Sequence, residues 1–136
     1  MKYCLLLLGM FLFLQVNAHT DTTAKDSLDV KPSASLNAKT GLATYYHRKF
    51  EGRKTTSGAR YRRSKLTAAH RSLPFGTIVT VTNLSNGKSV DVEINDRGPF
   101  TKRYIIDVSE SAAKELGFFS KGQSTVEISY PTGPED

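Results

Sequence analysis

A carboxylate and a guanidinium stand side by side in the hexapeptide Asn95-Asp96-Arg97-Gly98-Pro99-Phe100. The segment 90–94 before it alternates apolar and polar residues, which is typical of a strand with one buried face. Asp96 continues the apolar parity, so its side chain is expected at the core face where the strand ends. Partial burial there would raise the pKa of the carboxyl, as an acid catalyst near neutral pH requires. The alternative is that Asp96 caps the Gly-Pro turn or pairs with Arg97.

A hairpin is predicted to support this acid. Asn86-Gly87 between two β-rich runs favours a two-residue type I′ turn. Such a turn places Val79 opposite Ile94 and Thr77 opposite Asp96. Apolar residues then meet apolar residues, polar residues meet polar ones, and the acid is held on a rigid element.

The remaining elements are predicted to be short. Strands are expected over 41–46, 104–108 and 126–130, and a helix over 110–116 with Ser109 as its N-cap and Gly117 as its C-cap. The segment 66–69 fits a strand or a helix equally well. Many short strands with one short helix indicate an all-β fold, a small β-barrel.

A basic segment separates the first strand from the rest. From Arg48 to Arg71 there are nine Lys or Arg residues and one acid, Glu51. Gly52, Gly58 and a Thr-Thr-Ser cluster in this segment favour a long loop, and long ordered loops on small domains are often functional. The alternative is a solvated basic face.

The chain begins with a pattern typical of a signal peptide over residues 1–18. Its apolar run is too short to span a bilayer. Cys4, the one cysteine, precedes that run, so neither a lipid anchor nor another stable membrane anchor is expected. Residues 19–39 are predicted to form a flexible leader, 40–130 the folded domain and 131–136 a tail. The sequence thus predicts a monomeric, single-domain protein exported to the periplasm or beyond.

Net charge and composition limit the classes of partner and cofactor that are expected. The formal net charge is +6, and an exported basic domain is expected to meet anionic envelope polymers rather than nucleic acid. Ordinary solubility would also explain the charge. The histidines are scattered and no ligand spacing appears, so we expect no metal and no cofactor. No constellation supports a serine or cysteine nucleophile.

Seven short motifs occur in order along the chain. They are Gly41-x-Ala43-Thr44-Tyr45-Tyr46, Lys54-Thr55-x-Ser57-Gly58, Thr67-Ala68-Ala69-His70, Leu73-Pro74-x-Gly76-Thr77, Val81-x-Asn83-Leu84, Asn95-Asp96-Arg97-Gly98-Pro99-Phe100 and Ile106-Asp107-x-Ser109. The sequence resembles the rare lipoprotein A family, whose domain is a six-stranded double-psi β-barrel. The resemblance implies a lytic transglycosylase that cleaves peptidoglycan glycan strands, with a preference for strands without stem peptides.

The resemblance also assigns roles to individual residues. Asp96 matches the catalytic aspartate of the family, and His70 matches a second residue implicated in activity. Arg97, Tyr46 and Asn95 are expected to bind substrate or to orient the acid. Alternatively, His70 satisfies a structural hydrogen bond, and the aromatic residues belong to the core.

The chain departs from the family pattern at several positions. Ala59 stands where the family commonly has a glutamate, and an alanine cannot bind a sugar hydroxyl or move a proton. Tyr45 and His47 replace a favoured tryptophan and a favoured glycine. No cysteine follows the apolar run as the family's lipid-attachment cysteine does, and the glycan-binding repeat found in many members is not expected here.

The expected chemistry differs from hydrolysis. In lytic cleavage the sugar's own 6-hydroxyl attacks the anomeric carbon and closes a 1,6-anhydro ring. One residue, here Asp96, can then act first as acid and later as base. The departure at Ala59 favours an alternative: a non-catalytic module that binds or loosens peptidoglycan in the manner of expansins.

Overall fold

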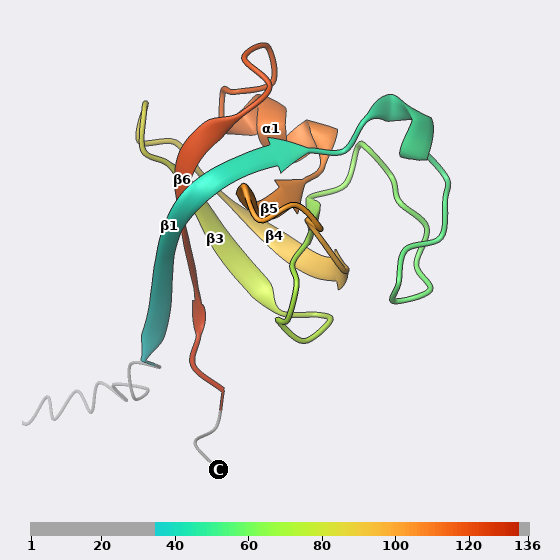
Figure 1. Cartoon of the computed structure of the whole chain (residues 1–136), viewed down its shortest axis with the longest axis horizontal. Coiled ribbons are helices and arrows are strands. Elements are labelled where there is room, and N and C mark those ends of the chain that lie inside the picture. The colour runs from blue at the N-terminus through green and yellow to red at the C-terminus, as the bar shows by residue number, and fades with distance from the viewer. Residues whose placement is uncertain (1–34, 134–136) are drawn as a thin grey trace, which may run out of the picture. The chain divides into compact units, whose positions relative to one another are not determined.

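The computed structural model describes residues 35–133, which form a closed barrel with one short helix (Figure 1). The strands are β1 (Leu36–Tyr45), β2 (Thr67–Ala69), β3 (Ile78–Asn83), β4 (Ser89–Asp96), β5 (Tyr104–Val108) and β6 (Ser124–Pro131). A 3₁₀ turn, η1 (Arg48–Phe50), follows β1, and the helix α1 (Glu110–Glu115) follows β5. The predicted all-β class, six strands and single short helix are confirmed for this part of the chain.

The barrel closes in the order β1-β5-β2-β4-β3-β6. The pairs β1·β5 and β2·β4 are parallel, and the remaining neighbours are antiparallel. The short strand β2 lies between the two strands that carry the acids. Its residue Ala69 pairs with Asp96 of β4 on one side and with Asp107 of β5 on the other. Closure therefore brings both acids to the same end of β2.

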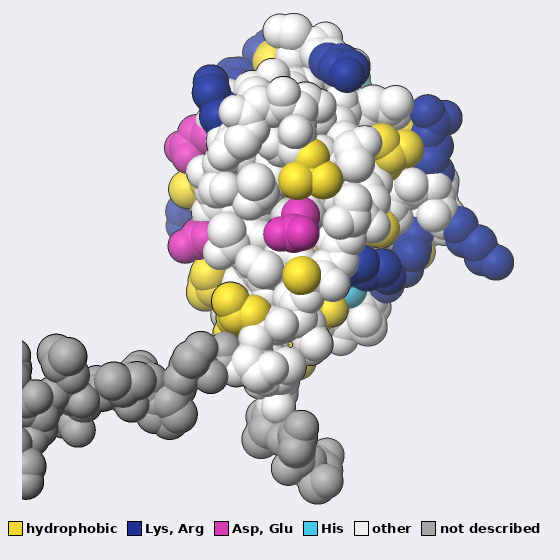
Figure 2. Space-filling model, turned by 90° about the vertical axis from the view of Figure 1, so that its left-hand side faces the viewer, with side chains coloured by type: hydrophobic (Ala, Val, Ile, Leu, Met, Phe, Trp, Pro, Cys, Tyr) yellow, Lys and Arg dark blue, Asp and Glu magenta, His cyan; other side chains and the backbone are white. Residues whose placement is uncertain are grey.

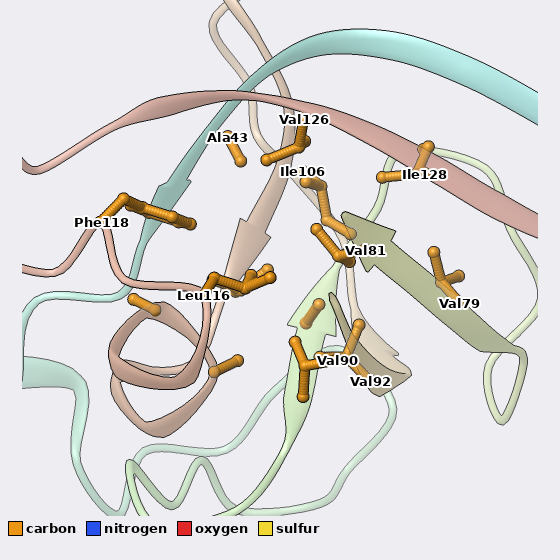
Figure 3. Close-up of a cluster of buried hydrophobic side chains, with 14 of the residues drawn as sticks. Ala43, Val79, Val81, Val90, Val92, Ile106, Leu116, Phe118, Val126 and Ile128 are labelled. Atoms are coloured by element: carbon orange, nitrogen blue, oxygen red, sulfur yellow. The ribbon is translucent and has the colours of Figure 1, made fainter. Parts of the chain in front are cut away.

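Alternating apolar residues fill the barrel (Figure 3). Inward-facing positions of β3, β4, β5 and β6 are fully buried, and Leu116 and Phe118 after α1 complete one side of the core. Burying one such side chain contributes about 1.5–3 kcal/mol. The core thus fixes the ends of the strands, which carry the polar residues described below.

The predicted hairpin register is wrong by two residues. Val79 pairs with Val92 and Val81 with Val90, and the connection between β3 and β4 is longer than the expected two-residue turn. Because the shift is even, every side chain keeps its face and apolar residues still meet apolar ones. Thr77 accepts a hydrogen bond from the backbone N–H of Ile94, so it does not lie opposite Asp96.

Buried Asn83 explains the longer connection. Its side-chain amide donates to the carbonyl of Leu116 at 2.8 Å, and its Oδ1 accepts from the Ser85 N–H and the Ser124 hydroxyl. These contacts satisfy a polar side chain that is only 2% exposed. A two-residue turn would not leave Asn83 at this position, so tertiary hydrogen bonds override the local turn preference.

The boundaries of the barrel also differ from expectation. Strand β1 begins at Leu36, which pairs with Pro131 of β6, so residues 36–39 belong to the barrel rather than to a flexible leader. The backbone N–H of Thr132 donates to the carbonyl of Ser35, which extends order into the expected tail. The predicted signal peptide and the leader up to residue 34 lie outside the described residues.

Other local predictions are confirmed. Strand β5 has the expected bounds, and Ser109 caps α1 by accepting from the backbone N–H of Ala112. Gly117, with φ of 79°, ends the helix in the left-handed conformation. The undecided segment 66–69 contains β2. Within residues 35–133, no helix has both the length and the apolar character needed to cross a bilayer.

Candidate active site

Asp96 is the last residue of β4 and lies half-buried at the wall of a cleft of about 510 Å³. The pairing of β2 with β4 shifts register between Ala68 and Ala69, next to the acid. Such irregularities re-aim side chains at strand ends. The segment that follows β1 forms another wall of the cleft and projects away from the barrel in Figure 1. A volume of this size accommodates a small-molecule or sugar ligand.

Four hydrogen bonds hold the Asp96 carboxylate. The hydroxyl of Tyr46 donates to Oδ2 at 2.6 Å. The backbone N–H and the hydroxyl of Thr56 donate to Oδ1 at 2.9 and 2.8 Å, and the backbone N–H of Arg97 donates to the same oxygen at 2.9 Å. Both oxygens therefore act as acceptors, which is the pattern of an ionised carboxylate.

This arrangement reverses the predicted direction of the Asp96 pKa. Burial acts to raise the pKa, but the hydrogen bonds from Tyr46, Thr56 and Arg97 together lower it below its usual value. Strand parity predicts burial but not these donors, because they belong to residues 40 and 50 positions away in the chain. At neutral pH, Asp96 is therefore ionised and carries no proton to donate.

Tyr46 is itself fixed by aromatic packing. Its ring lies 4.5 Å from the ring of Tyr61 and 6.0 Å from that of Phe50, measured between centroids. Burial, followed by the hydrogen bond to Asp96, strongly raises the pKa of Tyr46, so the phenol stays neutral and remains a donor. Tyr46 was predicted to bind substrate, and the structure gives it a direct contact with the acid.

Asp107 of β5 is a second carboxylate in the cleft, and the sequence analysis assigned it no role. Burial, followed by the negative charge of Asp96, raises the pKa of Asp107 to about 6. Its Oδ1 is buried and has no hydrogen-bond partner. The sequence signal for Asp107 is its place in the motif Ile106-Asp107-x-Ser109, one of the seven that carry the family resemblance.

The ring of His70 does not line the cleft. Its Nδ1 accepts hydrogen bonds from the backbone N–H groups of Ser72 and Leu73, at 3.2 and 3.1 Å. The residue is 8% exposed, and burial followed by the charges of neighbouring cations lowers its pKa. The link to the acid runs through the backbone, where the His70 N–H donates to the carbonyl of Asp96. The structure therefore shows a turn-stabilising histidine beside the site.

Arg97 and Asn95 occupy different surroundings from Asp96. Arg97 borders the cleft, but one guanidinium nitrogen donates to the carbonyls of His70 and Leu73, and the group lies 4.0 Å above the ring of Phe75. Asn95 lines a separate hollow that it shares with Ala59. Neither residue lines the cleft around Asp96. Asn95 faces away from it because adjacent strand residues point to opposite faces.

Arg71, which was not among the predicted site residues, supports the loop that carries Phe100 at one rim of the cleft. The guanidinium of Arg71 donates to the carbonyls of Pro99, Thr101 and Tyr104. These bonds fix the loop that carries Phe100, whose side chain is 89% exposed at the cleft. An exposed aromatic ring on a fixed loop is available to stack on a ligand.

The near rim of the cleft is cationic. Lys49, Arg53 and Lys54 line it, and Lys49 and Arg53 also approach the ring of Phe50. Lys and Arg side chains also gather along the right-hand edge of the face in Figure 2. The cleft thus combines two carboxylates inside with positive charge and aromatic rings at its margin.

Solved structures share the fold. The barrel is similar to the Streptomyces papain inhibitor, with a TM-score of 0.58 and 23% identity over 71% of this chain and 96% of that one. It is also similar to the apo expansin of Clavibacter michiganensis, with a TM-score of 0.58 and 22% identity over 74% of this chain and 53% of that one. At this identity the similarity shows the fold alone.

Sequence relatives are much closer. The endolytic peptidoglycan transglycosylase RlpA of Haemophilus influenzae is 53% identical over 90 residues, which cover 66% of this chain and 31% of the relative. The protein of the same name from Neisseria meningitidis serogroup A is 52% identical over 90 residues, covering 66% and 38%. The chain thus spans about a third of the length of these curated relatives.

A family description agrees with these relatives. The family model described as lytic transglycolase, a double-psi β-barrel domain, matches residues 38–128, nearly the whole of the described barrel. The resemblance expected from the seven motifs is therefore confirmed. The chain belongs to the lytic transglycolase family of double-psi β-barrel domains.

Proposed function

We propose that this barrel is a lytic transglycosylase that cleaves peptidoglycan glycan strands between N-acetylmuramic acid and N-acetylglucosamine. The observation that carries the proposal is the ionised Asp96, held by four hydrogen bonds at the wall of a 510 Å³ cleft. The family and the names of the relatives supply the reaction class. Those names also specify an endolytic enzyme and an envelope substrate, which we carry over to this chain.

Asp96 acts as the base in this reaction. Its lowered pKa leaves a carboxylate at neutral pH, which accepts the proton of the muramyl 6-hydroxyl as that oxygen attacks the anomeric carbon. The same negative charge stabilises the positive charge that develops on the sugar ring. Tyr46 and Thr56 hold the carboxylate in place, so little reorganisation is needed as the reaction proceeds.

The cationic rim supports a preference for strands without stem peptides. Removal of the peptide leaves a free lactyl carboxylate on each muramyl residue. Lys49, Arg53 and Lys54 at the rim attract such groups, while Phe50 and Phe100 offer ring faces for sugars. Partners are therefore glycan strands of the wall, and the site of action is the envelope outside the cytoplasm.

His70 contributes by positioning. Its Nδ1 fixes the turn that includes Leu73, and that turn supplies the carbonyls that hold the Arg97 guanidinium. The backbone bonds of His70 and Arg97 then fix the end of β4, where Asp96 lies. A role in activity is compatible with this arrangement without any contact between the imidazole and the substrate.

The test is product analysis. Purified glycan strands without peptides are incubated with the protein, and 1,6-anhydromuramyl ends are measured by mass spectrometry. We expect release by the wild type and a loss of at least about 100-fold in Asp96→Asn. Asp91→Asn is the matched control, because Asp91 lies on the same strand but contacts Thr80 on the exposed face. Equal release by the wild type and Asp96→Asn would refute the role of Asp96.

A second candidate function is binding or loosening of peptidoglycan without cleavage. Ala59, in place of the family's common glutamate, is the observation that favours it. Pull-down on purified sacculi distinguishes the two functions. Retention on sacculi with no anhydro product from the wild type would support the binding module.

A further inference from the structure

The proposed function leaves one proton without a donor. Lytic cleavage needs an acid to protonate the leaving glycosidic oxygen, but the hydrogen bonds to Asp96 keep that residue ionised. Resting on the proposed function, we propose that Asp107 is this acid and that the cleft works with two carboxylates of unlike protonation. In place of the expected single residue acting as acid and base, Asp96 then acts as the base and Asp107 as the acid.

Strand order places the two carboxylates appropriately. Ala69 of β2 pairs with Asp96 on one side and with Asp107 on the other, so two strand spacings of about 4.8 Å separate the acids across the sheet. Both acids line the same cleft. Gly98, which also lines the cleft, lies beside Asp107 without a side chain of its own. A glycosidic bond bound in this cleft would therefore meet both acids.

The surroundings of Asp107 suit a neutral carboxyl group. Its Oδ1 is buried without a partner, whereas Asp96 has donors on both oxygens. A buried charge without hydrogen bonds is far more costly than a buried neutral group. The other oxygen, Oδ2, lies near Gly98, where an added Cβ would stand 3.8 Å away. Gly98, with φ of 133°, thus brings no side chain against the carboxyl.

Together with burial, the charged groups around β5 leave the pKa of Asp107 raised. On the β4 side, the negative charge of Asp96 adds to burial and raises the pKa of Asp107 to about 6. Arg71, after β2, lowers it, but its guanidinium is bound to backbone carbonyls of the loop 99–104. Toward β1 stands the neutral phenol of Tyr46, and the Arg97 guanidinium is bound to the carbonyls of His70 and Leu73.

The chemical step balances with these two groups. The bond between the muramyl anomeric carbon and the glycosidic oxygen breaks, and the Asp107 proton passes to that oxygen. The 6-oxygen of the same muramyl residue bonds to the anomeric carbon, and its proton passes to Asp96. Once the product has left, solvent carries the proton from Asp96 back to Asp107, so no water is consumed and no other reactant is required.

An activated substrate tests the role of Asp107. On glycan strands we expect Asp107→Asn to lose about 100-fold or more in kcat/KM. On the 2,4-dinitrophenyl β-glycoside of N-acetylmuramic acid, whose leaving group needs no proton, the same variant should keep activity within about tenfold of wild type. Asp96→Asn should lose activity on both substrates, and Asp91→Asn on neither. Equal losses by Asp107→Asn on both substrates would overturn the assignment.

A titration of the Asp107 carboxyl tests the proposal even if no substrate is cleaved. Carboxyl carbon NMR on the full chain should show Asp107 titrating near 6, with a lower pKa in Asp96→Asn, because the neighbouring negative charge is removed. An Asp107 pKa near 4 that is unmoved in Asp96→Asn would overturn the proposal. Absence of anhydro products from the wild type on both substrates would instead count against the proposed function, while the titration would still report on the carboxyl pair.

Discussion

The phenol of Tyr46 donates a hydrogen bond of 2.6 Å to Oδ2 of Asp96. This contact joins the residue after β1 to the last residue of β4 at the wall of the cleft. It makes the acid depend on a side chain 50 positions earlier in the chain. The ionisation state of the Asp96 carboxylate is thus set by closure of the barrel rather than by its own strand alone.

Removing this donor should change the titration of Asp96. In Tyr46→Phe the ring packing on Tyr61 is kept, but the hydrogen bond that lowers the Asp96 pKa is lost. We expect the pKa of Asp96 to rise and stability at pH 7 to fall by about 1 kcal/mol. The control is Tyr45→Phe, which removes the bond from Tyr45 to the Phe119 carbonyl and should leave Asp96 unchanged. An unshifted Asp96 in Tyr46→Phe would contradict the contact.

Asp107 should make the barrel less stable as pH rises. Its folded pKa, about 6, exceeds the value of 3.8 expected when unfolded, so the folded state binds the proton more tightly. Its contribution is favourable below about pH 4 and is lost between about pH 4 and 6. The contribution of Asp96 has the opposite sign, because its folded pKa is lowered, and is lost as pH falls below about 4.

The measurement is the free energy of unfolding in urea from pH 4 to 7, for the wild type and Asp107→Asn. The difference between them should change by about 2 kcal/mol in favour of the variant over this range. The contribution of His70, whose lowered pKa favours stability above about 6.5, is common to both proteins and cancels in the difference. A difference that does not vary with pH would show that Asp107 titrates normally.

Substitutions of His70 should separate support of the turn from chemistry. His70→Ala leaves the backbone N–H groups of Ser72 and Leu73 without their acceptor, and we expect a loss of about 2 kcal/mol in stability. His70→Asn offers an oxygen near the Nδ1 position and should recover part of both stability and product release. The shape of the pH profile should match that of the wild type. A stable His70→Asn with no activity would instead show that the imidazole acts in catalysis.

The cationic rim should determine affinity in a salt-dependent way. In the double variant Lys49→Gln and Arg53→Gln, we expect KM for peptide-free strands to rise about 3–10-fold at low ionic strength. The effect should shrink at about 0.5 M salt, because exposed charges are screened. Chitin oligomers, which lack the lactyl carboxylate, should bind both proteins alike, and Lys121→Gln, outside the cleft, serves as control. A salt-independent change would point to lost packing instead.

The side chain of Asn83, at the end of β3, should contribute more to the free energy of unfolding than that of Asn86 in the connection that follows. Asn83→Ala removes three hydrogen bonds in a buried site, and we expect a loss of about 2–3 kcal/mol in urea unfolding. Asn86→Ala removes a similar bond to the Leu116 carbonyl and the bond that its Oδ1 accepts from the Lys88 N–H, both at a more exposed position, and should cost about 1 kcal/mol. Equal losses would show that the buried amide does not fix the loop.

Local patterns predicted the elements well because they depend on nearby residues. Spacing between residues that are close in the sequence predicts the alternating faces of β4, the Ser109 cap and the strand at 104–108. The register of the hairpin did not follow, because Asn83 satisfies groups in segments 33 and 41 residues away. Long-range hydrogen bonds of this kind leave no trace in a local pattern.

The site was predicted in part for the same reason. Strand parity and the family resemblance both led to Asp96, and the resemblance added Tyr46. Neither indicated that the His70 ring supports a turn, or that Asp107 lies on the other side of Ala69 from Asp96. The pKa directions depend on Thr56 and on strand order, so only the assembled barrel reveals which acid has the raised pKa.

The pairing of Ser35 with Thr132 has a consequence for engineering. A few added residues suffice to join these positions, and new ends can be opened in the solvent-exposed connection between β3 and β4, as tolerant surface loops allow. Such a rearranged chain would keep all six strands and leave the cleft untouched. The order in which the strands are synthesised would change, while their neighbours in the barrel would remain the same.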